Sequence, residues 1–137
     1  MAVTSTLAKL TSISLLLLLA MCTPVHALAP DAGEIGKVKG SGVLERNGAV
    51  ITGGSGVGVK SMDTAVTAKG TMQIDFVDET RVDITEHSRL LIDEFVYDPS
   101  NGRGSLGLKA SLGTMRYASG QIAKKYKQNV KIRTPSA

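Results

Sequence analysis

Alternation of apolar and polar residues is the dominant pattern in this chain. It is clearest in MQIDFVDETRVDITEHSRLLIDEFVYD, residues 72 to 98. Successive side chains of a strand point to opposite faces of a sheet, so this alternation predicts strands with one apolar face. We therefore predict a core of these apolar positions and their counterparts elsewhere in the chain: Val43, Ile74, Phe76, Val82, Ile84, Leu90, Ile92, Leu106 and Leu108.

Glycine-bounded segments on either side repeat the pattern. IGKVKGSGVLERNG predicts two β-segments that close on Asn47-Gly48, a dipeptide that tolerates the positive φ of a hairpin turn. GAVITGGSGVGVKSMD predicts a loop or a bulged strand, and SLGLKASLG, TMRYASGQI and NVKIRTP predict three more strands. Beyond the N-terminal run there is no apolar stripe of helical period. The expected fold is all-β: a sandwich, jelly roll or β-taco-like roll of short antiparallel strands.

The first 29 residues have the order of a secretory signal peptide. Lys9 precedes a short apolar run from Ile13 to Cys22. This run is followed by VHA and ALA, which resemble the small-residue cleavage sites of signal peptides. The run has about ten residues, whereas a membrane-spanning helix needs about 20. We expect cleavage after Ala27 or Ala29, a domain over residues 30–137, and a periplasmic or secreted protein that does not span the membrane. Acylation of Cys22 is disfavoured because Met21 is large.

The residue types of the domain and their spacing disfavour most kinds of enzyme chemistry. Removal of the signal would take away the only cysteine and leave His87 as the only histidine, so no disulfide and no zinc site are expected. The eight carboxylates of residues 72–98 alternate with apolar residues or sit in turns, which places them on a solvated face. In GGSGVGVKS, Val59 separates the last glycine from Lys60, contrary to the phosphate-binding loop. We expect a non-enzymatic domain without a cofactor.

Charge divides the domain into two parts. All twelve acids lie between Asp31 and Asp98, and residues 101–137 hold eight bases and no acid. Two interpretations stay open: the two segments pair as neighbouring strands, or the basic part meets an anionic partner. Nucleic acid is not expected, because only two tyrosines accompany the bases. The candidate partner-binding basic edge comprises Lys124, Lys125, Lys127, Lys131 and Arg133.

The order of these segments resembles the FecR domain family. The matching motifs are IGKVKGSGVLERNG, MDTAVT, FVDET, EHSRLLIDEF, SLGLKASLG, SGQIAK and VKIRTPSA, which together cover residues 33 to 137. The resemblance implies a β domain in which SGQIAK supplies a G-x-I strand. It also implies structural roles for the motif residues Arg46, Gly48, Asp63, Phe76, Asp78, Thr80, Ser88, Gly120, Thr134 and Pro135.

The resemblance also implies a function, with two departures. FecR-type regulators combine a cytoplasmic domain that controls a sigma factor, one membrane helix and this outer domain. Here only twelve residues precede the apolar run, so we expect no cytoplasmic domain and no anti-sigma activity. The family usually continues beyond T-P-x-A, so a C-terminally truncated domain with an unpaired edge is an open alternative.

Two functions are consistent with these patterns. The first is a sensor or adaptor module in the periplasm or envelope that acts through protein contacts, for instance by strand addition. The alternative is a structural module of the envelope or surface that binds glycan or lipopolysaccharide through its basic C-terminal third.

Overall fold

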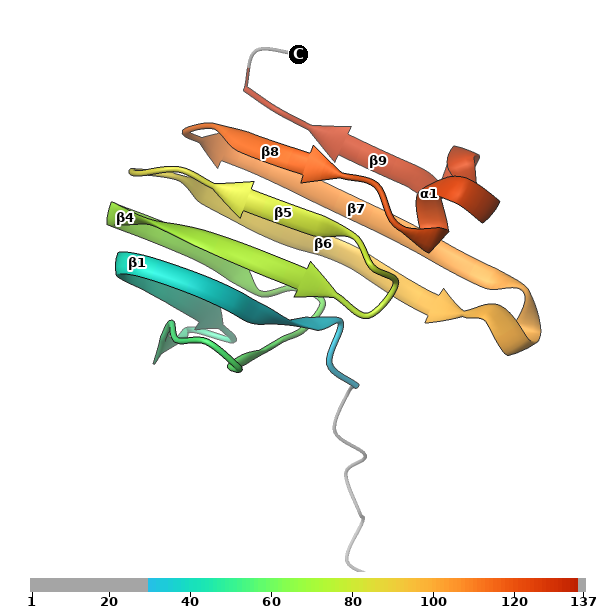
Figure 1. Ribbon diagram of the computed structural model, residues 1–137, viewed down its shortest axis with the longest axis horizontal. Coiled ribbons are helices and arrows are strands. Elements are labelled where there is room, and N and C mark those ends of the chain that lie inside the picture. Colours follow the sequence, from blue (N-terminus) through green and yellow to red (C-terminus); the bar gives the residue numbers. More distant parts are fainter. Residues whose placement is uncertain (1–29, 136–137) are drawn as a thin grey trace, which may run out of the picture.

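The computed structural model describes residues 30–135, which form one mixed, open β-sheet of nine strands with a short α-helix (Figure 1). The strands are β1 (Gly33–Arg46), β2 (Ala49–Thr52), β3 (Gly58–Val59), β4 (Thr64–Phe76), β5 (Arg81–Ile84), β6 (Arg89–Asp98), β7 (Arg103–Leu112), β8 (Met115–Ala118) and β9 (Val130–Arg133). The helical segments are the 3₁₀ turn η1 (Pro99–Asn101), helix α1 (Gln121–Lys125) and the 3₁₀ turn η2 (Lys127–Asn129). The predicted signal peptide lies outside the described residues.

The two longest strands, β1 and β4, are antiparallel partners that divide the sheet into two arms. The first half of β1 pairs with the second half of β4, which continues through β5 to β8; we call this the front arm. The other halves continue through β6 and β7 to β9, and we call this the rear arm. In Figure 1, β1, β4, β5 and β8 run side by side in front of β6 and β7.

Glycine marks the division between the arms. Gly40 pairs with Gly70, and the register shifts immediately afterwards, between Gly40 and Gly42. Gly40 has a φ of 73°, and a Cβ on Gly70 would lie 2.8 Å from the backbone nitrogen of Ser41. Larger residues do not fit so close an approach, so this pair allows both long strands to pass from one arm to the other.

The core lies between the arms and confirms the alternation over residues 72 to 98. Front-arm and rear-arm side chains form one buried cluster, which includes these predicted members: Ile74, Phe76, Val82, Ile84, Leu90, Ile92, Leu106 and Leu108. The prediction for Val43 is wrong, because Val43 is only half-buried and Leu44 is fully buried instead. A bulge between Ile35 and Lys37 shifts the alternation of β1 by one residue, which exchanges the faces of Val43 and Leu44.

Several other expectations about the elements are confirmed or corrected. Asn47 and Gly48 both have positive φ, 50° and 79°, and join β1 to β2 as the predicted hairpin turn. The strands are not uniformly short or antiparallel: β1 has 14 residues, β4 has 13, and β9 runs parallel to β7. The expected strand in SGQIAK is wrong, because residues Gln121–Lys125 form α1, whose Ile122 is fully buried.

The acidic and basic segments do pair as neighbouring strands. β5 is antiparallel to β8, and β6 is antiparallel to β7. The four ion pairs among residues 30–135 nevertheless all join partners between Asp31 and Arg89: Lys60–Asp31, Arg89–Glu45, Arg46–Asp63 and Arg81–Asp75. Strand pairing therefore brings the two segments together without joining their charges in ion pairs.

Candidate functional site

Arg46 and Asp63 form a largely buried ion pair at the end of β1. Arg46 donates from Nε to Asp63 Oδ1 at 2.8 Å and from Nη2 to Oδ2 at 2.6 Å, and also to the carbonyl of Gly58. The backbone nitrogen of Lys60 donates to the same carboxylate at 2.8 Å. Hydrogen bonding to Asp63, opposed by partial burial, raises the pKa of Arg46. This bidentate pair holds the segment between β3 and β4 against β1.

Asp78 is fully buried in the turn between β4 and β5, although the sequence places it in a solvated turn. Its carboxylate accepts hydrogen bonds from the nitrogen and the hydroxyl of Thr80, at 3.1 and 2.8 Å. It also accepts from the nitrogen of Ile122 in α1 at 3.1 Å. A Cβ on Gly120 would collide with the carbonyl oxygen of Asp78. Asp78, Thr80 and Gly120 together dock α1 on this hairpin.

Ser88 belongs to a third buried group of hydrogen bonds. Its backbone nitrogen donates to the hydroxyl of Thr67 at 3.0 Å, and that hydroxyl donates to the carbonyl of Thr85 at 2.6 Å. A Cβ on Gly113 would collide with the hydroxyl of Ser88. These contacts join the turn before β6 to β4 and to the turn before β8.

The remaining motif residues have simpler environments. Gly48 is exposed in the hairpin turn, and Phe76 is buried and stacks on Phe95 with a centroid separation of 5.3 Å. Thr134 and Pro135 follow β9, half-buried and exposed respectively. The motif residues are thus spread over the molecule in separate structural contacts and do not converge on one site.

The candidate basic edge is not a single strand edge. Lys124 and Lys125 lie in α1, Lys127 in η2, and Lys131 and Arg133 in β9; all five are exposed. Among the described residues, neither these five nor Arg103, Lys109 and Arg116 form an ion pair with a carboxylate. All eight bases after residue 100 are therefore exposed, and none has a carboxylate partner in the described part of the chain.

The edge of the front arm is formed by β8, which pairs only with β5 within the described part of the chain. Thr85 lies opposite Thr114, since Ile84 pairs with Met115, and its nitrogen donates to the Thr114 carbonyl at 3.0 Å. Hydrogen-bonded and non-hydrogen-bonded pairs alternate along an antiparallel ladder. Met115 and Tyr117 therefore direct their backbone groups away from β5. We call this side the free edge of β8.

The hydroxyl of Tyr117 is buried without a hydrogen-bond partner among the described residues. Burial and the neighbouring charge of Asp78 raise the pKa of this phenol. The Tyr117 ring is half-buried and packs on the core beside the free edge. A buried, unsatisfied hydroxyl costs stability, so the hydrogen bonding of β8 is incomplete at Tyr117.

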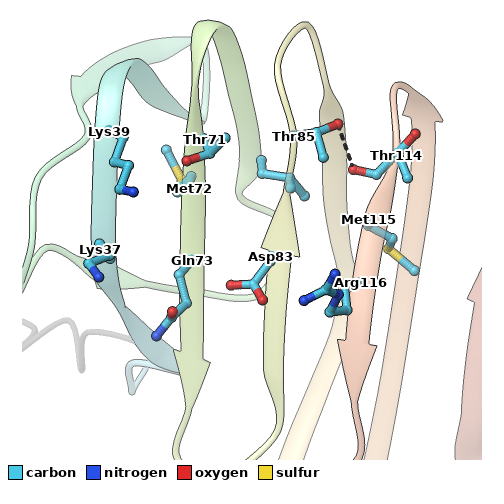
Figure 2. A pocket seen from close by; sticks show the side chains of 11 residues that line it. Lys37, Lys39, Thr71, Met72, Gln73, Asp83, Thr85, Thr114, Met115 and Arg116 are labelled. Atoms are coloured by element: carbon cyan, nitrogen blue, oxygen red, sulfur yellow. Dashed lines mark hydrogen bonds between the residues drawn. The ribbon is translucent and has the colours of Figure 1, made fainter.

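A groove crosses the outer face of the front arm (Figure 2). Its volume is about 540 Å³, and most of its lining comes from four adjacent strands and the residues that flank them: Lys37, Lys39, Thr71, Met72, Gln73, Asp83, Ile84, Thr85, Thr114, Met115 and Arg116. We call it the front groove. Alternation predicts that Asp83 lies on a solvated face, but it does not predict the groove, because the bases of the groove come from β1 and β8 and meet only through the strand order.

No group of three or more histidine, cysteine, aspartate or glutamate side chains among residues 30–135 is arranged to hold a metal ion. No helix in the same range is long and apolar enough to cross a membrane.

Comparison with known proteins gives no match. No family model matches the chain, and neither a curated protein nor a solved structure is significantly similar to it. The resemblance to FecR domains therefore remains a prediction from the motifs.

Proposed function

We propose that this chain is an exported, non-enzymatic FecR-like domain that binds a protein partner in the periplasm or cell envelope. The observation that carries the proposal is the free edge of β8, which offers the backbone groups of Met115 and Tyr117 in a strand with one partner. Exposed strand edges bind extended peptides by adding a strand to the sheet. Such binding relies mainly on backbone hydrogen bonds, which agrees with a sequence that carries no catalytic motif.

The packing of the arms supports a folded β-taco-like roll, the finer form of the predicted fold. β8 ends the front arm and β9 ends the rear arm, and the half-buried Met115, Tyr117, Tyr126 and Val130 pack on the same core. In this proposal the roll opens between β8 and β9. A partner strand on β8 would cover the rings and side chains at that opening.

A pair of substitutions at one position tests strand addition. Tyr117→Ala removes the ring but keeps the backbone N–H, whereas Tyr117→Pro removes both the ring and the donor. With the purified chain as bait in an envelope extract, we expect Tyr117→Ala to retain the wild-type partner and Tyr117→Pro to lose it. Circular dichroism must show that both variants are folded. Equal capture by both folded variants would contradict strand addition at β8.

A second candidate function is favoured by the unpaired bases. Because none of the eight bases after residue 100 forms an ion pair with a carboxylate in the described structure, their charges are available to glycan or lipopolysaccharide. A variant with Lys124, Lys125, Lys127 and Lys131 changed to Gln tests this candidate. Salt-sensitive capture of lipopolysaccharide by the native chain and not by the variant would support it. Equal capture by both would exclude these lysines as the binding surface.

A further inference from the structure

The front groove is built from two cross-strand rows of polar side chains. Lys37 pairs with Gln73, Gln73 with Asp83, and Asp83 with Arg116, so these four form one row across β1, β4, β5 and β8. Lys39 pairs with Thr71 in the next row, which Thr85 and Thr114 continue. Figure 2 shows both rows on the same face of the front arm.

The floor of the groove lies between the rows. Met72 and Ile84 are buried in the core, so alternation places their backbone, rather than their side chains, towards the groove. The Thr85 hydroxyl donates to the Thr114 carbonyl at 3.2 Å and closes the gap between the strands there (Figure 2). The volume of about 540 Å³ lies within the usual range for small-molecule sites.

The charges of the groove are available to a ligand. Lys37, Lys39, Arg116 and Asp83 form no ion pair among the described residues. In contrast, Asp75 and Arg81 in the adjoining row are joined at 2.7 Å. The groove therefore carries three unpaired cations around one unpaired carboxylate.

We infer that the front groove binds an anionic sugar, a hydroxyl-rich ligand that carries carboxylate or phosphate groups. Lysine and arginine supply charge-assisted hydrogen bonds to the acidic groups. Thr71 and Thr114 can both donate to and accept from sugar hydroxyls. Gln73, whose amide nitrogen already donates to Asp75, can accept through its amide oxygen, and Thr85 and Asp83 can also accept. Asp83 would weaken the attraction of a simple inorganic anion to the three cations, so the combination favours a ligand with both acidic groups and hydroxyl donors.

This site adjoins the free edge of β8 at Met115, but Lys37, Lys39 and Arg116 contribute only side chains on the outer face, so replacing them leaves the backbone of the free edge intact. It shares its ligand class and Arg116 with the second candidate function, but the lysines of the two sites differ. Matched variants can therefore distinguish the two sites. One replaces Lys37, Lys39 and Arg116 by Gln, and the control replaces Lys124, Lys125 and Lys127 by Gln.

Calorimetric titration of the purified chain tests the inference with four probes. A galacturonic acid trimer and mannose 6-phosphate supply the two acidic groups, a neutral galactose trimer lacks them, and inorganic pyrophosphate lacks the sugar. We expect at least one acidic sugar to bind and the neutral trimer to bind far more weakly. The groove variant should weaken acidic-sugar binding about tenfold or more, and the control variant should leave it unchanged.

Asp83→Asn separates sugar recognition from simple attraction of anions. Asp83→Asn should weaken binding of the acidic sugar, because it exchanges a charged carboxylate acceptor for an amide with one weaker acceptor oxygen. It should strengthen binding of pyrophosphate, because it removes a negative charge. Three results would overturn the inference: no binding of either acidic sugar, binding that only the control variant abolishes, or an Asp83→Asn variant that binds sugar and pyrophosphate more tightly alike.

Discussion

At the scale of single residues, buried carboxylates hold this small sheet together. Asp63 is 1% exposed and Asp78 is fully buried, and each accepts hydrogen bonds from at least two other residues. Burial of a carboxylate is tolerated when hydrogen bonds or a cation compensate for lost hydration. Both residues were predicted as structural positions of a FecR-like motif, but the pattern around Asp78 does not indicate its burial.

Removal of Arg46 should destabilise the domain, because it leaves Asp63 buried without its cation. We expect Arg46→Ala to lower the free energy of unfolding by about 3 kcal/mol, the lower end of the range for a broken buried pair, since Arg46 itself is partly exposed. Urea denaturation measures the change. Arg81→Ala is the matched control, because its pair with Asp75 is exposed and should contribute little. Equal losses in both variants would contradict this account.

The unsatisfied hydroxyl of Tyr117 gives a prediction with a defined pH dependence. Tyr117→Phe should leave stability unchanged or increase it by up to about 1 kcal/mol at pH 7, because no hydrogen bond is lost. The pKa of Tyr117 is raised by burial, so the folded state holds the phenolic proton more tightly than the unfolded chain does. The protonated Tyr117 phenol therefore makes its full contribution to the free energy of unfolding below the unfolded pKa of about 10. This contribution is lost as the pH rises further.

Denaturation at several pH values checks this sign. Above pH 10, the unfolding free energy of the wild type should fall relative to that of Tyr117→Phe, because only the wild type has the phenol that ionises. A marked destabilisation of Tyr117→Phe at pH 7 would show that the hydroxyl has a partner after all.

At the scale of elements, α1 depends on a hairpin far from it in sequence. The helix has five residues, too few for a visible helical period, and its first turn is bound by Asp78 and anchored by Ile122. The motif SGQIAK therefore reads as a strand when only alternation is considered. Its conformation follows from a tertiary contact, which the sequence pattern does not encode locally.

Asp78→Ala should detach this helix. The nitrogens of Thr80 and Ile122 would lose their acceptor, at a cost of about 2–4 kcal/mol. Hydrogen exchange should increase in residues 120–126 more than in the rear arm. Asp78→Asn keeps one acceptor oxygen and should lose less unfolding free energy than Asp78→Ala. Glu79→Ala removes only an exposed hydrogen bond from Gln121 and should change the unfolding free energy by less than about 0.5 kcal/mol. Unchanged exchange in Asp78→Ala would contradict the docking role.

At the scale of the whole molecule, alternation predicts much of the core but not the path of the sheet. The apolar set over residues 72–98 was predictable because the strands there are regular. Val43 was not, because the bulge near Gly36 depends on the pairing of β1 with β4. The front groove was hidden for a related reason: Lys37 and Arg116 are 79 residues apart and lie on one face only through the order β1-β4-β5-β8.

The measurement that tests the central claim most directly is amide hydrogen exchange of β8 in the purified chain, resolved by residue with NMR. If the edge of β8 is free, the amides of Met115 and Tyr117 should exchange more than about tenfold faster than that of Arg116, which the ladder directs towards β5. Addition of the captured partner should slow Met115 and Tyr117 selectively. Equal, slow exchange of all three amides in the chain alone would show that the edge is already covered, and the proposed binding mode would be wrong.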